Sequence, residues 1–382
     1  MKSKLIRITT VPVSFENLLG NQLSFMKDFY DVTAISSDVK RLAKFGKNQE
    51  VNTYCVELTR KITPIKDIKA LIKLYLFLKK EKPLIVHTHT PKAGIIGMLA
   101  SYLAKVPFRL HTVAGLPLME VKGIKRIILN FVEKLTYKFA TKIYPNSLGL
   151  MKFILKSKFT KKTKLKIIAN GSSNGIDLSY FNPELYSKNE KLSLRSDLLI
   201  EKDDFVFIFV GRIVRDKGIN ELVGAFEKLS SEINKIKLLL VGPFEDDLDP
   251  IRKESKKIIE NNKNIISVGY QNDVRPYFSI ANVLVFPSYR EGFPNVVLQA
   301  GAFGLHSIVT NINGCNEIIS ENKNGWMIPV KDEKAILNSM RNCILKKEIL
   351  IEEKSNIINL IASRYNQRDV WEGILTEYNF LK

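Results

Sequence analysis

The stretch FVFIFVGRIVRDKGINELVGAF (205–226) decides the fold, because a strand, a glycine turn and a helix follow one another within it. Its first six residues are all apolar, as expected for a strand buried on both faces of a parallel sheet. The pattern changes at Gly211, and apolar residues recur at helical spacing after Gly218. A strand followed by a helix is the repeating unit of a doubly wound α/β sheet.

The same alternation runs through the whole chain. The strand patterns lie at 4–10, 32–36, 52–58, 84–89, 108–113, 142–146, 164–170, 205–211, 237–242, 265–270, 282–288, 307–311 and 326–330. A chain of 382 residues suits two domains, so we predict two doubly wound, Rossmann-like domains.

A polar stretch without a strong strand pattern (183–204) is the expected linker. It places the first domain at 1–190 and the second at 204–363. The final segment, 364–382, has helical apolar spacing, and packing back on the first domain is one of its possible positions.

Composition indicates a globular protein of the cytoplasm. The longest apolar runs are too short to cross a bilayer, and the N-terminus lacks the pattern of a signal peptide. Cys55, Cys315 and Cys343 are scattered, which argues against disulfides and against a zinc site.

Charge is the unusual bulk property, since 59 basic and 39 acidic residues leave a net charge of +20. Thirteen Lys or Arg lie between Lys122 and Lys166, opposed only by Glu133. Ile127, Ile128, Phe131, Leu135 and Phe139 recur there at helical spacing. Two interpretations fit: a helix that lies on an anionic membrane surface, or a core-facing helix with a solvated lysine face.

The turn after the strand at 205–210 carries two cations, Arg212 and Lys217. Ligands of open α/β sheets bind beyond the carboxyl ends of the strands. Arg212 can fork onto phosphate oxygens, and Lys217 can supply a mobile charge, so the turn is a candidate diphosphate site. The alternative is a solvated basic turn.

The stretch PSYREGFPNVVLQAGAFG (287–304) contains a turn and then a helix expected to begin at Pro294. The free N–H groups of the first helical turn attract anions. Because Glu291 would repel a phosphate, it should address hydroxyl donors such as those of a sugar ring. Gln299, eight positions later, could face a second hydroxyl group.

These motifs, together with TNINGCNEII (310–319) and NGWMIPV (324–330), resemble the donor domain of retaining glycosyltransferases of family 4, which have the GT-B fold. NGSSNGIDLSYFNP (170–183) resembles the segment that closes their first domain. The resemblance covers essentially the whole chain. It implies a hexosyltransferase of EC class 2.4, with two Rossmann-like domains and a cleft between them.

Carried over to this sequence, the resemblance implies that Arg212 and Lys217, after Gly211, hold the donor diphosphate. Glu291 would contact hydroxyls of the transferred sugar, a UDP-sugar being the expected donor. The backbone of Gly292, Phe293, Pro294 and Asn295 would line the sugar and the phosphate. The family usually has a second glutamate that grips the ribose, and Gln299 takes its place here. An amide offers one neutral acceptor instead of a carboxylate, so weaker or rearranged ribose binding is expected.

On the first domain, His111 matches a family histidine that faces the donor sugar, through a ring hydrogen bond or a backbone carbonyl. His87 and His89 lie on one face of a strand, and we expect them to shape the acceptor side or to satisfy the strand end, not to bind a metal. Gly20 stands alone where many relatives have a glycine pair, which indicates a longer loop and a different acceptor pocket.

We expect neither a cofactor nor a catalytic metal. Asp247 and Asp249 form an Asp-x-Asp string, but it follows a glycine-ended strand as an acidic surface loop. Arg212 and Lys217 already provide positive charge for the diphosphate.

The implied mechanism is retaining transfer in which the leaving phosphate takes the acceptor proton. The basic segment 122–166 suits a lipid diphosphate-linked acceptor, or another saccharide, at the inner membrane face. A bacterial polysaccharide, capsule or lipopolysaccharide pathway, with the enzyme peripheral to the membrane, is then expected by analogy.

Two alternatives belong to other functional classes. A nucleotide-sugar 2-epimerase shares the architecture but needs carboxylates placed for proton transfer. A nucleic-acid-binding protein would use the charge, yet the sequence lacks a recognition motif or stacked aromatics. We therefore expect no nucleic-acid partner.

Overall fold

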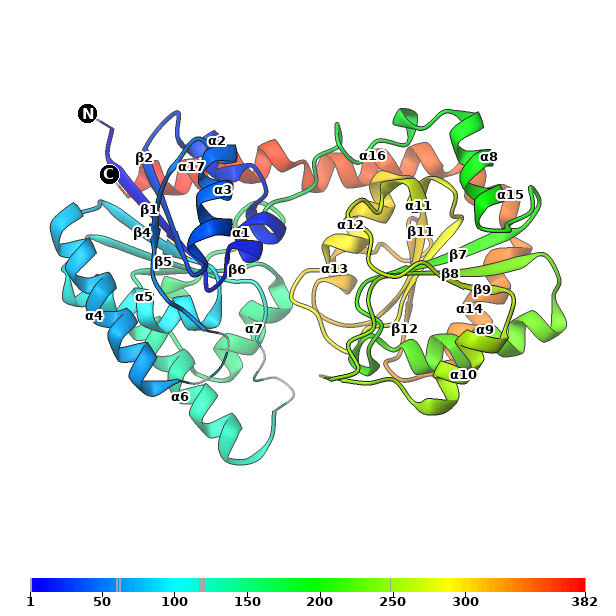
Figure 1. Cartoon of the computed structure of the whole chain (residues 1–382), viewed down its shortest axis with the longest axis horizontal. Helices are drawn as coiled ribbons and strands as arrows, with labels where there is room; N and C mark the ends of the chain where they lie inside the picture. The colour runs from blue at the N-terminus through cyan, green and yellow to red at the C-terminus, as the bar shows by residue number, and fades with distance from the viewer. Residues whose placement is uncertain are drawn as a thin grey trace. The chain divides into compact units, whose positions relative to one another are not determined.

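A computed structural model describes residues 2–59, 61, 63–116, 118, 121–247 and 249–381. The chain divides into two compact units (Figure 1): unit 1 comprises Met1–Gly175 and Gln367–Lys382, and unit 2 comprises Ile176–Asn366. The boundary therefore lies upstream of the expected linker at 183–204. That segment contains helix α8 (Lys188–Asp197), whose Arg195 donates hydrogen bonds to the carbonyls of Ile280, Glu201 and Asp204 in unit 2.

Unit 1 is built on a six-stranded parallel sheet with the strand order β3-β2-β1-β4-β5-β6. Its strands are β1 (Lys4–Ile8), β2 (Asp31–Ser36), β3 (Asn52–Cys55), β4 (Ile85–Thr88), β5 (Phe108–Val113) and β6 (Lys142–Pro145). The chain order reverses between β1 and β4, which are hydrogen-bonded neighbours. Ligands of doubly wound sheets bind at this kind of switch point.

Two helical layers cover the sheet of unit 1. Side chains alternate between its faces, so Leu5 and Ile6 of β1 belong to different hydrophobic clusters. The cluster of Leu5 includes residues of α1 (Pro12–Leu19), α2 (Gln22–Met26), α3 (Val39–Gln49) and α17 (Gln367–Phe380). The cluster of Ile6 includes residues of α4 (Pro64–Glu81), α5 (Pro91–Leu103), α6 (Gly123–Phe139) and α7 (Leu148–Lys156).

Unit 2 repeats this architecture with the strand order β12-β11-β10-β7-β8-β9, again all parallel. Its strands are β7 (Phe205–Val210), β8 (Ile236–Val241), β9 (Ile265–Ser267), β10 (Val283–Phe286), β11 (His306–Thr310) and β12 (Gly325–Ile328). All six residues of β7 are buried, as the apolar run predicts. Its switch point lies between β7 and β10.

The helices of unit 2 connect and cover these strands. They are α8 (Lys188–Asp197), α9 (Ile219–Glu232), α10 (Lys253–Asn261), α11 (Arg275–Ser279), α12 (Asn295–Ala302), α13 (Cys315–Ile318), α14 (Glu333–Leu345), α15 (Lys347–Glu352) and α16 (Lys354–Tyr365). Within the described residues, no helix of either unit has the length and apolarity needed to cross a membrane.

The predicted strand at 164–170 is wrong. Only Leu165 forms a bridge, to Ile143 beside the sheet. Ala169 has a φ angle of 49°, which ends the extended conformation. The Lys164 ammonium group donates to carbonyls at the C-terminal end of α6, including those of Tyr137 and Ala140.

Candidate functional site

The candidate donor site lies in unit 2, where the turns that leave β7 and β10 meet. These strands flank the switch point of the sheet. The β7 turn contains a short 3-10 helix, Arg215–Lys217, and ends at Gly218. Gly218 has a φ angle of 72°, and a Cβ there would lie 2.1 Å from the carbonyl oxygen of Pro287. Only glycine allows the two turns to approach this closely.

Lys217 and Glu291 form an ion pair across the two turns. The Ser288 hydroxyl donates to the same Glu291 oxygen at 2.9 Å. Each side chain of the ion pair is 16% exposed, and Lys217 Nζ lies 5.3 Å from the centre of the Phe286 ring. The structure thus brings Lys217 and Glu291 together, as expected for one site. It adds Ser288, which the sequence analysis missed although Ser288 lies in the stretch 287–304.

Arg212 lies at the rim of the same turn. Its Nη1 donates to Glu245 Oε2 at 2.7 Å, and its side chain is 43% exposed. Burial lowers the pKa of the Arg212 guanidinium, but the hydrogen bond and charge of Glu245 outweigh this effect and leave the pKa raised. Arg212 is therefore a permanent cation with donors on its exposed side.

The acidic loop at 245–250 supports this basic turn. Asp249 pairs with Arg215 at 2.9 Å and accepts from the backbone N–H of Asp216 at 2.7 Å. Asp216 in turn pairs with Arg290 at 2.9 Å. These contacts give Glu245 and Asp249 a structural role. Across the described part of the chain, no three His, Cys, Asp or Glu side chains are grouped so that they could hold a metal ion.

Helix α12 begins one residue later than predicted, because Pro294 is its N-cap and Asn295 its first residue. The preceding turn packs on Gly314: a Cβ at Gly314 would lie 2.7 Å from the Gly292 carbonyl oxygen and 2.7 Å from Phe293 Cα. Gln299 is half-buried on α12, whose other side buries Val297, Leu298 and Ala300. The turn next to Glu291 is thus closely packed on Gly314.

His87 and His89 take part in a buried hydrogen-bond network of unit 1. Arg7 Nε donates to His89 Nε2 at 2.9 Å, and Arg7 Nη1 donates to the Tyr378 hydroxyl at 2.9 Å. His87 Nδ1 lies 2.6 Å from that hydroxyl, and its Nε2 lies 2.8 Å from the Thr112 hydroxyl. Burial holds the pKa of both imidazoles well below the ordinary value. Both rings are therefore neutral, and their expected place on the acceptor side stays a prediction.

His111 is buried on β5, on the other face of the sheet. Its Nδ1 lies 2.8 Å from the Thr88 hydroxyl, and its ring is packed against Gly94, where an added Cβ would lie 2.7 Å from Cε1. Burial lowers the pKa of His111 to about 4. The ring is thus a neutral core group in this conformation, and its contact with a donor sugar stays a prediction.

Gly20 does not lie in a long loop after β1. The chain turns directly from Ile8 through three residues into α1, and Gly20 caps the C-terminal end of that helix with a φ angle of 50°. It lines a pocket of about 690 Å³ with residues of α3 that include Lys40 and Lys44. The expected long loop is therefore wrong, and the acceptor-side role of Gly20 stays a prediction.

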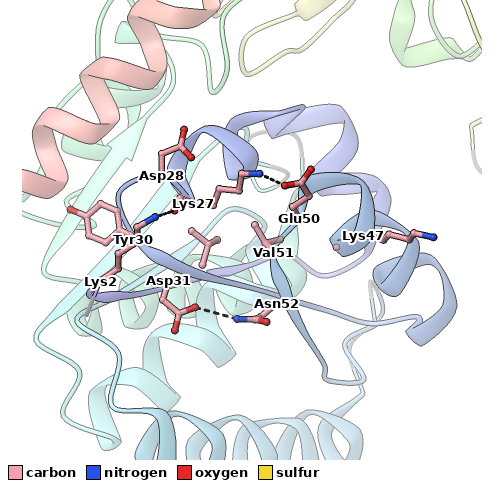
Figure 2. Close-up of a pocket in the computed structure, with 11 residues that line it drawn as sticks. Lys2, Lys27, Asp28, Tyr30, Asp31, Lys47, Glu50, Val51 and Asn52 are labelled. Atoms are coloured by element: carbon pink, nitrogen blue, oxygen red, sulfur yellow. Dashed lines mark hydrogen bonds and ion pairs between the residues drawn. The ribbon is translucent and has the colours of Figure 1, made fainter.

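A second pocket of unit 1, of about 620 Å³, lies near the amino ends of β2 and β3 (Figure 2). Two interactions cross this pocket: Lys27 pairs with Glu50, and Asn52 donates to Asp31 at 3.1 Å. This edge of the sheet is opposite the strand carboxyl ends, where ligands of such sheets bind.

Comparison with known proteins gives two matching sequence profiles. The profile described as "Glycosyl transferases group 1" matches residues 190–359, which include the turns of Lys217 and Glu291. The profile described as "Glycosyl transferase 4-like" matches residues 14–165.

Two relatives match nearly the whole chain. A capsular polysaccharide biosynthesis glycosyltransferase, CapM of Staphylococcus aureus, is 33% identical over 99% of this chain and 98% of its own length. The UDP-Gal:alpha-D-GlcNAc-diphosphoundecaprenol alpha-1,3-galactosyltransferase of Escherichia coli is 30% identical over 96% of this chain and 95% of its own length.

Among solved structures, HepE of Anabaena in complex with UDP and glucose superposes with a TM-score of 0.82 at 16% identity, covering 99% of this chain and 100% of that one. The predicted GT-B fold, with two doubly wound domains, is confirmed.

Proposed function

Because the chain belongs to the group 1 glycosyl transferases, we propose that it transfers a hexose from a UDP-sugar to a lipid diphosphate-linked glycan acceptor. The relatives from S. aureus and E. coli are named for capsular polysaccharide and for a diphosphoundecaprenol acceptor. By analogy, the product belongs to bacterial surface polysaccharide assembly.

The observation that carries this proposal is the meeting of Lys217 and Glu291 at the switch point of unit 2. A diphosphate there accepts hydrogen bonds from Arg212 and Lys217, and the first N–H groups of α12 favour its charge. Glu291 then leaves Lys217 and accepts from hydroxyls of the sugar. Gln299, on the next turn of α12, forms a hydrogen bond with the ribose.

In the proposed reaction, the bond from the anomeric carbon to the phosphate oxygen breaks, and a bond to the acceptor oxygen forms on the same face. The leaving phosphate takes the acceptor proton, which balances the charge and releases UDP. Arg212 and Lys217 stabilise the charge that develops on this phosphate. Because these cations come from the chain itself, we expect transfer to persist in the presence of EDTA.

The acceptor side belongs to unit 1 in this proposal. The segment 122–166, with thirteen cations and one acid, contacts an anionic membrane surface where a lipid-linked acceptor lies. The enzyme is then peripheral to the inner membrane face.

The donor site is tested by measuring the Tm of the purified protein in the presence of UDP, GDP, ADP and their sugars. We expect a rise in Tm with UDP that is lost in Arg212→Ala. Arg341→Ala is the matched control, because Arg341 forms a surface pair with Glu232 in the same unit. A folded protein that responds to no nucleotide would overturn the assignment.

Sugar transfer to an undecaprenyl diphosphate-linked acceptor then tests the reaction, with the anomeric configuration of the product read by NMR. An inverted product contradicts the retaining mechanism. Conversion of the UDP-sugar without any acceptor would identify the epimerase reaction instead.

A further inference from the structure

The outer surface of the helical layer α4, α5 and α6 exposes an unusual amount of apolar side chain. Four such residues lie on α4: Ile65 (74% exposed), Ile68 (57%), Ile72 (53%) and Leu76 (58%). Four more lie on α6: Ile124 (77%), Ile127 (67%), Ile128 (47%) and Phe131 (62%). Exposed apolar side chains gathered on one helix face in this way mark an interaction site.

The stripe on α4 is a second face of that helix and not the edge of its core face. Ala70, Leu74 and Leu78 are the buried residues of α4. With 3.6 residues per turn, Ile72 lies two residues from both Ala70 and Leu74 and therefore points to the opposite side. The helix thus has an inner apolar face and an outer one.

Helix α6 has the same arrangement with different residues inside. It buries Glu133, Thr136 and Tyr137 and turns Ile127 and Phe131 outward. The interpretation of this segment as a core-facing helix is therefore wrong for Ile127, Ile128 and Phe131. The membrane-surface interpretation is the one that agrees with their exposure.

The two outer faces lie on the same side of unit 1. Buried residues of α4, α5 and α6 belong to one cluster with Ile6, Ile8 and Val86 of the sheet. Helices α4 and α6 both pack against α5, and Figure 1 shows the three helices on one face of the sheet. A flat surface can therefore meet both stripes at once.

The charges around the stripes are almost all positive. Helix α4 carries five lysines, and α6 carries three lysines and Arg126. The acids of these helices are Asp67, Glu81 and Glu133. Asp67 is paired with Lys92 at 2.5 Å, Glu81 with Lys4 at 2.7 Å, and Glu133 is buried. The outer face therefore presents apolar groups flanked by cations.

We propose that the α4–α6 face docks flat on an anionic lipid bilayer, with α4 as a second anchoring helix beside α6. The apolar side chains enter the boundary between headgroups and acyl chains, and the lysines contact anionic headgroups. The inference rests on the proposed function for its partner, since the lipid-linked acceptor lies in the same bilayer.

This docking fixes the orientation of unit 1. The helical layer separates the sheet from the lipid, so the sheet lies parallel to the membrane plane. The carboxyl ends of β1 and β4 are then held about one helix diameter, roughly 10 Å, above the headgroups. A second copy of the chain fits this face poorly, because two cationic surfaces repel each other.

Co-sedimentation of the full chain with vesicles tests the proposal. One set of vesicles is pure phosphatidylcholine, and the other is phosphatidylcholine and phosphatidylglycerol in equal parts. We expect binding to the anionic vesicles only. The double variants Ile68→Ser/Ile72→Ser on α4 and Ile127→Ser/Phe131→Ser on α6 should each weaken it about tenfold or more. Leu345→Ser, which changes an equally exposed residue of unit 2 (80%), is the control and should bind as the wild type does.

Three outcomes would overturn the proposal. If the α4 variant binds anionic vesicles as well as the wild type does, α4 is not part of the docking face. No vesicle binding by the wild type would reject the face entirely, although stabilisation by UDP would still support the donor site. A wild-type dimer that the α4 variant converts to a monomer, measured by light scattering, would identify a second copy as the occupant. Because the changed residues are exposed, all variants should keep the Tm response to UDP.

Discussion

Lys217 and Glu291 form an ion pair although 74 positions separate them in the chain. The pair exists because β7 and β10 are neighbours in the sheet, so that their turns meet. In the proposed reaction each partner has another role, Lys217 on the diphosphate and Glu291 on the sugar. The ion pair is then the resting arrangement, which the donor replaces.

Glu291→Gln should separate these two roles. Loss of the carboxylate weakens contact with the sugar hydroxyls, and we expect kcat to fall by about 10²- to 10³-fold. Lys217 is released for the diphosphate, so UDP should bind as tightly as before or more tightly. Steady-state kinetics and UDP calorimetry measure the two effects.

The control for this prediction is Glu333→Gln, which breaks a surface pair with Lys228 in the same unit. It should change neither quantity. A Glu291→Gln protein that loses UDP binding in proportion to kcat would contradict the separation of roles.

Gln299 is the position at which the proposed ribose contact differs from the family pattern. A hydrogen bond to a charged acceptor contributes about 1 kcal/mol more than one to a neutral acceptor. Gln299→Glu should therefore tighten UDP binding about fivefold in calorimetry. Gln299→Leu, which removes the acceptor, should weaken it. Unchanged affinity in both variants would place the ribose elsewhere.

The turns of the donor site could be predicted from sequence because their signals are local. The apolar run of β7 gives the strand, and Gly211, Arg212 and Lys217 follow within seven residues. The ion pair itself could not, because it depends on strand order. The supporting contacts of Glu245 and Asp249 depend on the same order, since they come from the end of the neighbouring strand β8.

Helix α8 explains why the domain boundary was placed too late. None of its residues is buried, so its sequence resembles a linker. A capping box of Ser187 and Glu190 and the hydrogen bonds of Arg195 hold it in place instead. Helix α6 misleads in the opposite way, because it buries Glu133 and Thr136 beside Tyr137 and exposes Ile127 and Phe131. Periodicity shows that a helix has two faces and does not show which one is inside.

The hydrogen bond between Arg7 and Tyr378 is the contact that the sequence could least predict, because 371 positions separate the two residues. The Tyr378 hydroxyl also contacts His87 Nδ1. Tyr378→Phe would leave the buried atoms Arg7 Nη1 and His87 Nδ1 without this hydrogen-bond partner. We expect the free energy of unfolding to fall by about 2 kcal/mol. Denaturant unfolding should show this loss of stability, while the Tm response to UDP should persist.

Tyr102→Phe is the control for that variant, because Tyr102 is 51% exposed on α5. Its effect should stay within about 0.5 kcal/mol. A Tyr378→Phe protein as stable as this control would show that the buried network does not depend on α17.

Glu133 should make stability depend on pH. Burial raises the pKa of its carboxyl group to about 7, against about 4.3 in an unfolded chain. The protonated form is favoured in the folded state, so its contribution is complete below about pH 4 and is lost as the pH rises through about 7. Glu133→Gln keeps a neutral group at every pH. The variant should therefore gain up to about 3 kcal/mol over the wild type between about pH 5 and about pH 8 in denaturant unfolding. Glu232→Gln, which changes an exposed position, is the control and should show no such gain. If the free energy of unfolding of Glu133→Gln and of the wild type changes equally with pH, the Glu133 carboxyl group is ionised in the core.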